Sequence, residues 1–401
     1  MPYFLYSSPV SQVKRDRVTI LAYAQLGGWG FFLYGFSPLI PLLRDEQGTS
    51  AAVAGLHGTA MAVGGVLGGL LFTPLVRRLG RGRTTWLGLG GLAVAVTLLC
   101  LLRPFGATLT AALLGALGGT LVASGVAAVI SERHGKVASA AISEAYAVSI
   151  AVGLLAPLAT GFTARQWGSW RIGLVLILLL IGLVAVVAAV TGARLPDSDD
   201  SARGQRASRP RLPRPYWLAW LLLVVVGAIE ACVAFWSASV LRTHAGVSAA
   251  TATTLISAMV FGKLIGRVVG SAIAARVSTV PLVLSAFALS ATGFVVFWTS
   301  TVGWLAGAGL LVIGLGNAMH FPLVLSLAMS AAPGAADRAA AVANYANSLA
   351  FAVAPVALGG LADLFGPHRA FLLLPALLAA AALLAVSTGR MLRSPDVEPV
   401  R

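Results

Sequence analysis

The sequence predicts an all-α membrane protein in which twelve transmembrane helices form two pseudo-symmetric six-helix bundles. Of its 401 residues, 58% are hydrophobic and only 10% are charged. Apolar runs of about 20 residues, the length that crosses a bilayer as a helix, follow one another along the chain. The second half repeats residues of the first half at a constant offset of 198 positions. These features together indicate a duplicated bundle embedded in a lipid bilayer.

Most connections between the apolar runs are short. The exception is the segment 193–215, which is polar and contains several prolines, and which predicts a flexible cytoplasmic linker. It separates an N-terminal bundle at 1–192 from a C-terminal bundle at 216–401. The first run is long enough to span the bilayer, so we expect an uncleaved first helix. The predicted helices are 18–42, 50–73, 84–103, 107–130, 137–162, 171–192, 216–240, 249–274, 281–299, 304–329, 338–361 and 369–388.

Basic residues predict how the chain crosses the membrane. With a cytoplasmic N-terminus, cytoplasmic segments hold 20 of the 28 Lys and Arg residues and outer loops hold six. Because cytoplasmic loops are enriched in these residues, both termini are expected inside. The basic residues lie in short loops between apolar runs, so the net charge of +15 indicates membrane topology and no nucleic-acid partner. The abundance of alanine and arginine predicts a bacterial, multi-pass protein of the plasma (inner) membrane.

The repeat includes proline and arginine residues, which chance would rarely align at one offset in an apolar sequence. Ala156-Pro157 and Gly161 match Ala354-Pro355 and Gly359. Two parallel halves related by an axis along the membrane normal are an architecture of transporters. A second block matches Met61, Gly64, Gly68 and Arg78 with Met259, Gly262, Gly266 and Arg276.

Two cations stand inside a single predicted span. Lys263 and Arg267 lie one helical turn apart in 249–274, whereas the matching positions of the first half hold Gly65 and Gly69. Side chains four residues apart share a helix face. A charge at the bilayer centre costs at least about 2.5 kcal/mol, and ionisable residues there are usually functional. We therefore expect the chemistry to lie in one half of a duplicated scaffold.

Two acidic residues, Glu144 and Glu230, lie well inside predicted spans and balance these cations. Glu144 and Arg267 lie at similar depth and are expected to form a cytoplasmic gate that breaks on inward opening. Glu230 and Lys263 lie on successive helices, where a buried carboxylate beside an ammonium predicts a proton-coupling site. Static ion pairs that only offset desolvation are the alternative for both. Arg267 keeps its charge in almost any setting, so it is the first candidate, with Lys263, for binding an anionic substrate group.

Polar residues at helical spacing are further candidates for substrate binding. Pro322 is expected to bend its helix just after two of them. The alternative is that each makes a helix-to-helix hydrogen bond of about 0.6 kcal/mol. His57 is expected to pack between helices. The candidates are Gln25, Trp29 and Tyr34 in 18–42, Asn317 and His320 in 304–329, and Asn344, Tyr345 and Asn347 in 338–361.

With its twelve spans and central linker, the chain resembles the major facilitator superfamily over essentially its whole length. The loop 74–83, PLVRRLGRGR, is similar to the family's conformational loop motif, whose Gly-Arg end matches Gly80 and Arg81. The family pattern has an acidic residue four positions before the arginine. This chain has Arg77 there, followed by Arg78, so the usual charge latch between this loop and the other half lacks its acid.

A second motif lies in 137–162, where Gly153, Ala156-Pro157 and Gly161 loosely resemble the Gly/Pro signature of antiporters in the family. The family resemblance implies alternating access between the two bundles. It also implies that the first, fourth, seventh and tenth helices line a central cavity and that the third, sixth, ninth and twelfth face lipid. The fifth helix would face the eighth across the seam between bundles, and the second would face the eleventh.

We therefore predict a secondary active transporter of a small solute that is coupled to protons and works as a monomer. The cluster of acid and base favours a small organic anion or a zwitterion as substrate. A multidrug exporter of lipophilic cations, working as a proton antiporter, is the alternative, and a non-transporting membrane sensor is a remote one. The sequence contains no metal-binding, nucleophile or nucleotide-binding motif, so we expect neither an enzyme nor a bound cofactor or metal.

Overall fold

A computed structural model of the protein describes residues 13–196, 212–274, 276–333 and 336–393. Within these residues, twelve helical segments are long and apolar enough to cross a membrane, as predicted. The first span joins α1, the 3-10 turn η1 and α2, and the last joins α13 and α14. The helical elements are α1 Arg17–Phe36, η1 Ser37–Leu39, α2 Ile40–Gln47, α3 Ala51–Leu79, α4 Arg81–Leu101, α5 Phe105–His134, η2 Gly135–Val137, α6 Ala138–Trp167, α7 Arg171–Thr191, α8 Arg214–Thr243, α9 Ala249–Ala274, α10 Thr279–Thr299, α11 Gly303–Ser330, α12 Ala336–Phe365, α13 Pro367–Ala370 and α14 Leu373–Arg393.

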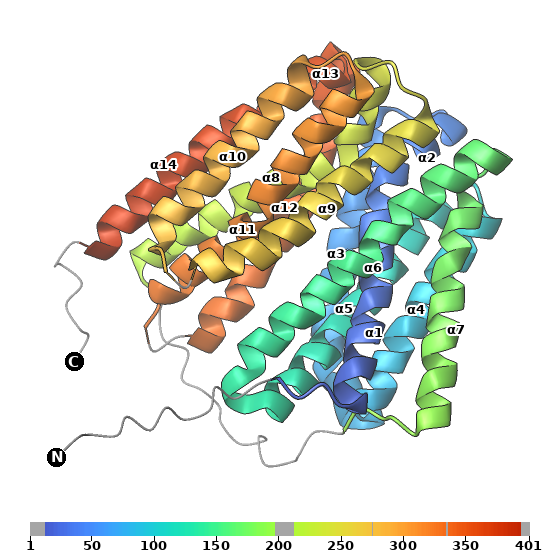
Figure 1. Cartoon of the computed structure of the whole chain (residues 1–401), viewed down its shortest axis with the longest axis vertical. Helices are drawn as coiled ribbons and strands as arrows, with labels where there is room; N and C mark the ends of the chain where they lie inside the picture. The colour runs from blue at the N-terminus through green and yellow to red at the C-terminus, as the bar shows by residue number, and fades with distance from the viewer. Residues whose placement is uncertain (1–12, 197–211, 275, 334–335, 394–401) are drawn as a thin grey trace, which may run out of the picture.

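The helices form two bundles, α1–α7 and α8–α14, which lie side by side (Figure 1). The starts of α1 and α8 and the ends of α7 and α14 lie at the same end of the bundles, here called the linker end. The opposite end is called the far end. Figure 1 shows that the bundles diverge toward the linker end. α6 packs against α9, and α3 packs against α12, so both predicted seams between the bundles are confirmed.

The sequence repeat is also a repeat of contacts. A Cβ atom added to Gly64 of α3 would lie 2.1 Å from the carbonyl oxygen of Leu113 in α5. The same atom on Gly262 of α9 would lie 2.1 Å from the carbonyl oxygen of Leu311 in α11. Both residues of the second contact lie 198 positions after their counterparts in the first. Glycine therefore allows the same close helix packing in both bundles.

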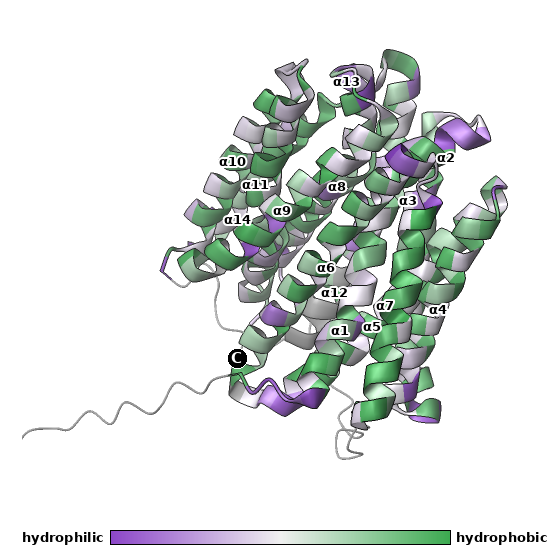
Figure 2. Ribbon diagram, turned by 45° about the vertical axis from the view of Figure 1, so that its right-hand side comes forward, coloured by the Kyte–Doolittle hydropathy of each residue, from purple (hydrophilic) through white to green (hydrophobic). Residues whose placement is uncertain are grey.

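The outer surface of the bundles is apolar along most of its length. Leu179, Leu183 and Val190 of α7 are 65%, 60% and 81% exposed, and Leu383 of α14 is 71% exposed. Figure 2 shows hydrophobic residues along the helices and hydrophilic residues gathered near helix ends such as α2 and α13. A surface of this kind is stable only against lipid. It agrees with the expectation that α7 and α14, the sixth and twelfth spans, face the bilayer.

Helix ends are where hydropathy predicts least well. The apolar run of α5 was expected to end at 130, but the helix continues to His134 and includes the polar Glu132 and Arg133. α14 likewise continues to Arg393 instead of ending at 388. A helix keeps its backbone hydrogen bonds after it leaves the hydrocarbon region, whereas hydropathy falls at once. The prolonged end of α5 carries two ion pairs, Glu132 with Arg81 and Arg133 with Asp16.

Polar contacts join the two bundles in their far half. The carboxylate of Asp363 in α12 accepts hydrogen bonds from the backbone N–H groups of Ala51 and Ala52, at 2.7 and 2.9 Å. The two donors belong to the first turn of α3, where N–H groups have no partner inside the helix. Asp45 of α2 forms an ion pair with Arg242 of α8 at 2.6 Å. Together these contacts join the bundles at the end opposite the linker.

Candidate functional site

A cavity of about 150 Å³ lies between the two bundles. It is lined by residues of α1 and α6 on one side and of α8, α9, α11 and α12 on the other. The first, seventh and tenth spans line it as expected. α5, the fourth span, contributes no residue to the lining described here, whereas seam helices do. The lining residues are Tyr34, Ile150, Glu230, Lys263, Arg267, Asn317, Ala318, Phe321, Pro322 and Asn347.

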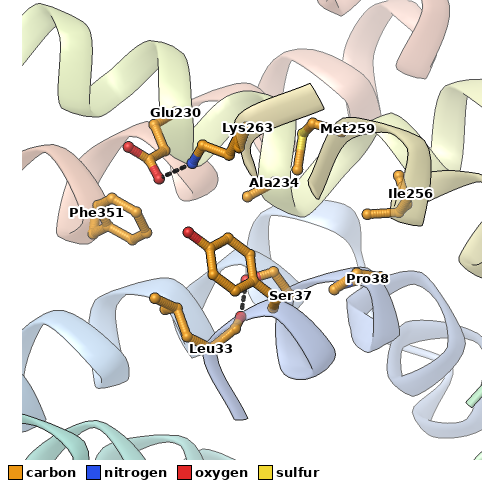
Figure 3. A pocket seen from close by; sticks show the side chains of 10 residues that line it. Leu33, Ser37, Pro38, Glu230, Ala234, Ile256, Met259, Lys263 and Phe351 are labelled. Carbon is orange, nitrogen blue, oxygen red and sulfur yellow. Dashed lines mark hydrogen bonds and ion pairs between the residues drawn. The ribbon is translucent and has the colours of Figure 1, made fainter. Parts of the chain in front are cut away.

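An ion pair between α8 and α9 forms the middle of the cavity wall. Lys263 is 5% exposed, and its Nζ donates a hydrogen bond to Oε1 of Glu230 (Figure 3). The ammonium also lies 5.5 Å from the ring centroid of Tyr34, across the space between the bundles. The expected pairing of Glu230 with Lys263 is therefore confirmed. Each charge offsets the cost of burying the other in the membrane.

Arg267 lies one helical turn from Lys263 toward the linker end and lines the same cavity. Among the described residues, its Nε is buried and has no hydrogen-bond partner. Asn317 of α11 is 3% exposed, and neither its amide nitrogen nor its amide oxygen has a partner in the described part of the chain. Buried polar groups without a partner are costly, so these two cavity-lining side chains are candidates for contact with a ligand.

A smaller cavity of about 20 Å³ continues from this site toward the far end. It shares Tyr34, Glu230 and Lys263 with the first cavity. Its other lining is mainly apolar, and in Figure 3 Leu33, Ser37 and Pro38 lie across the space from the ion pair. The site therefore has a charged wall on one side and an apolar extension beyond it. The remaining lining residues are Leu33, Ser37, Pro38, Ala234, Ile256, Met259 and Phe351.

The glycines of the antiporter-like motif make room for close packing. A Cβ atom added to Gly153 of α6 would lie 2.4 Å from Cδ2 of Tyr34, so this glycine creates the space for the Tyr34 ring. A Cβ atom added to Gly161 would lie 2.1 Å from the hydroxyl of Thr254 in α9, across the seam. The first glycine positions a cavity residue, and the second lets the bundles meet at their far ends.

Glu144 is not a deeply buried charge, which corrects the sequence-based expectation. Its side chain is 33% exposed, and it forms an ion pair with Arg15 at 2.9 Å. It also accepts a hydrogen bond from the hydroxyl of Tyr23 at 3.3 Å. The residue lies near the linker end of α6, where Arg15 precedes α1. The Glu144–Arg267 pair is not formed in this conformation, so its role in a closed gate stays a prediction.

Several of the other predicted binding residues lie outside the cavities. His320 packs between α11 and α10, with its ring centroid 4.8 Å from that of Phe287, so it does not line the cavity with Asn317. Gln25 is fully buried, and Tyr345 is 52% exposed. Trp29 stacks on Phe32 with ring centroids 6.1 Å apart. The side chain of Asn344 lies outside the described residues. Helical spacing alone did not indicate which way these side chains turn.

Two further predicted features lie away from the cavities. His57 is fully buried, with Nε2 2.9 Å from the hydroxyl of Thr108 in α5. This contact agrees with a packing role. In the basic loop, Gly80 has a φ of 82° and joins α3 to α4.

Arg81 follows this turn and makes two hydrogen bonds of 2.7 Å to Glu132 of α5. Both residues belong to the N-terminal bundle. Arg77 and Arg78 are exposed at the end of α3. The described contact of the loop therefore stabilises one bundle.

Sequence reasoning missed the apolar part of the site. Ile150, Ala318 and Phe321 line the cavity, but apolar residues give no signal in a chain that is apolar throughout. It also missed Arg15 as the partner of Glu144, because 129 positions separate the two residues. Asp363 had a detectable signal, since it is an acidic residue at the end of a predicted seam helix.

Comparisons with known proteins agree with this architecture. The sequence matches the model of the Major Facilitator Superfamily over residues 26–355. A search of curated proteins gave no match.

Solved transporters share the fold at low sequence identity. A bacterial homologue of the human lysosomal transporter Spinster, in an inward-facing and occupied conformation, is 14% identical, with 94% of this chain and 98% of that chain covered and a TM-score of 0.73. The human organic anion transporter MFSD10 is 18% identical, and the match covers 93% of this chain and 100% of that chain with a TM-score of 0.65. The nucleoside transporter NupG is 12% identical, and the match covers 92% of this chain and 98% of that chain with a TM-score of 0.72.

Proposed function

Because the chain belongs to the Major Facilitator Superfamily and is thus a multi-pass membrane transporter, we propose that it moves a small organic anion or zwitterion, coupled to protons. The observation that carries this proposal is the cavity between the bundles. It contains the guanidinium of Arg267, which has a buried and unpartnered Nε among the described residues. In alternating access the substrate binds between the two halves, and an arginine retains its charge there.

The ion pair of Glu230 and Lys263 is the proposed site of proton coupling. It lies beside the cavity, and Lys263 is buried. Protonation of Glu230 would remove the negative charge that holds the ammonium, leaving Lys263 near the Tyr34 ring and available to an anion. Proton binding and anion binding would then favour each other, since each acts on the same buried lysine.

The arrangement of the two bundles bears on which state of the transport cycle the structure represents. The many basic residues of the segments at the linker end support our proposal that this end and both termini lie on the cytoplasmic side of a bacterial plasma membrane. The bundles diverge toward that end and are joined at the far end, which is the arrangement of an inward-open state. In the opposite state, Glu144 and Arg267 would approach and close the cytoplasmic side. We propose that a single chain completes this cycle as a monomer.

A thermal-shift screen of purified protein tests the anion proposal. The panel contains small carboxylates, amino acids, sugars and lipophilic cations, each at about pH 5.5 and about pH 7.5, because proton and ligand binding that are coupled make the stabilisation depend on pH. We expect stabilisation by anions that is lost in Arg267→Ala. Stabilisation by lipophilic cations that persists in Arg267→Ala would contradict the proposal and would favour the multidrug exporter.

Proton coupling needs a separate measurement. Protein reconstituted into liposomes with a pH-sensitive dye inside is exposed to an anion found in the screen. We expect proton movement that follows the anion and that is lost in Glu230→Gln. Anion uptake without a pH change would contradict proton coupling while leaving the anion proposal intact.

A further inference from the structure

The charge of the cavity limits the charge of its ligand. Glu230, Lys263 and Arg267 are the charged residues of the lining. Lys263 and Glu230 neutralise each other through their hydrogen-bonded ion pair. The guanidinium of Arg267 remains as one positive charge without a described counter-charge. In the state that the structure shows, with Glu230 paired to Lys263, a ligand with one negative charge balances the charge of Arg267, whereas a second negative charge would be buried without a partner.

The same charge balance disfavours zwitterions. An ammonium group in the ligand needs a carboxylate or several carbonyl groups as acceptors. The only carboxylate in the described lining is that of Glu230, and Lys263 already occupies its Oε1. A bound amino acid would therefore place a second cation beside Lys263 and Arg267. Like charges that share one small cavity repel strongly, because the dielectric constant of a membrane interior is low.

The N-terminal bundle contributes no charge to the site. Its residues in the described lining are Tyr34 and Ile150 in the larger cavity, and Leu33, Tyr34, Ser37 and Pro38 in the smaller one. The repeat explains this difference, because the charged positions of the second half, and the position of Asn317, hold phenylalanine or glycine in the first. Glu230, Lys263, Arg267 and Asn317 correspond to Phe32, Gly65, Gly69 and Gly119.

The size of the cavity suits a ligand whose apolar part is a single ring. Its volume is about 150 Å³. An engineered protein cavity of about 150 Å³ lined by Leu, Ile and Phe takes up benzene. Phe321 and Ala318 add to the apolar lining beside Arg267, and the smaller cavity extends it.

We infer that the site selects monovalent carboxylates with an apolar body about the size of one benzene ring, such as benzoate. This inference rests on the proposed function. The carboxylate binds the guanidinium of Arg267 and the amide N–H of Asn317, and the ring lies against Ile150, Tyr34 and Phe321. Both polar residues line the cavity, and each has side-chain atoms without a partner in the described part of the chain. The site thus recognises charge at one end of the ligand and apolar surface at the other.

Isothermal titration calorimetry on the full-length protein in lipid nanodiscs tests this inference. Benzoate is compared with benzamide, which has no charge, with phthalate, which has a second carboxylate, and with phenylalanine, which adds an ammonium. Lactate and succinate test the apolar body. We expect a Kd for benzoate at least tenfold lower than for each other probe.

The outcomes separate the inference from the proposed function. Binding of lactate, succinate, phthalate or phenylalanine as tight as that of benzoate would overturn the selectivity and leave an anion or zwitterion site standing. Equal binding of benzamide and benzoate would overturn recognition of the charge. If no carboxylate or amino acid in the series binds, the inference and the proposed substrate class both fall.

Two variants and a control assign the contacts. Arg267→Gln is expected to weaken benzoate binding at least tenfold. Ile150→Asn is expected to lower the preference for benzoate over lactate at least threefold, because it makes the apolar wall polar. Arg165→Gln replaces an exposed arginine at the far end of α6 and is expected to leave both affinities unchanged. An unchanged preference in Ile150→Asn would contradict the proposed ring position, even if Arg267→Gln failed to fold.

Discussion

At the scale of single residues, the ion pair of Lys263 and Glu230 is the feature on which stability and function both depend. Lys263 is almost fully buried, and its partner lies on the neighbouring helix. Removing one partner of a buried ion pair leaves an uncompensated charge, whereas replacing both is often neutral. The pair can therefore be tested without reference to transport.

We expect Lys263→Met to lower the free energy of unfolding by about 3–5 kcal/mol, the cost of leaving one buried charge unpaired. The double variant Lys263→Met with Glu230→Gln should recover most of this loss. Denaturant unfolding of both variants in detergent micelles measures the difference. Equal stability of the two variants would contradict a strongly coupled pair.

His244, in the connection between α8 and α9, predicts a pH dependence. Its ring stacks on His368 of α13 at 3.7 Å, and His368 stacks on Trp298 at 4.5 Å. Burial and the neighbouring His368 lower the pKa of His244 below its ordinary value. The folded protein therefore favours the neutral ring, and the unfolded chain binds the proton more readily.

The sign of the effect follows from this lowered pKa. The stabilising contribution is complete above the unfolded pKa of about 6.5 and is lost as the pH falls through the lower folded pKa. We expect the apparent Tm to fall between about pH 7 and about pH 5, and to fall less in His244→Gln. Parallel curves for the two proteins would show that the stack does not titrate with folding.

At the scale of helices, the glycine contacts determine how closely α9 approaches α11. A methyl group on Gly262 would meet the carbonyl oxygen of Leu311, a backbone atom that cannot turn aside. We expect Gly262→Ala to cost about 1–3 kcal/mol through overpacking. Gly182 of α7 is the matched control, because an added Cβ there has no neighbour within 4 Å.

Gly182→Ala should leave stability unchanged or raise it by about 0.5–1 kcal/mol, since alanine is the better helix former. Thermal unfolding of the two variants measures both effects. A Gly262→Ala protein as stable as the control would mean that the helices separate at little cost. The repeat predicts the same result for Gly64→Ala in α3, which meets Leu113 in the same way.

At the scale of the whole molecule, Asp363 joins the two bundles at the far end. Its carboxylate accepts hydrogen bonds from the first turn of α3 in the other bundle. Charges of this sign near a helix N-terminus contribute about 0.3–1 kcal/mol. The repeat places Arg165 at the corresponding position of α6. The acidic contact is therefore present at one seam and replaced by a basic residue at the other.

We expect Asp363→Asn to shift the conformational equilibrium toward far-end opening by about two- to fivefold, the equivalent of that contact energy. Spin labels at Gly106→Cys and Trp304→Cys, one in each bundle near the far end, report the separation by electron–electron resonance after Cys100 and Cys232 are replaced by alanine. Glu46→Gln is the control, since Glu46 pairs with Arg171 inside one bundle. An equal shift in both variants would contradict the role of Asp363.

Much of the molecule was predictable from the sequence because the signals are local. Hydropathy alone indicated twelve spans, since each backbone segment in lipid must satisfy its own hydrogen bonds. The offset of 198 predicted the duplication and, with the family resemblance, the seams of α6 with α9 and α3 with α12. Charges as rare as Lys263 and Glu230 also pointed to the site, because an apolar segment tolerates them only for a reason.

The tertiary structure alone decided which side chains meet. Glu144 pairs with Arg15 and not with Arg267, and Asn317 turns into the cavity while His320 packs against α10. These outcomes depend on how each helix is rotated about its axis and on how far apart the bundles lie. Both are determined by packing between helices that are separated in the sequence, to which no local pattern of sequence responds.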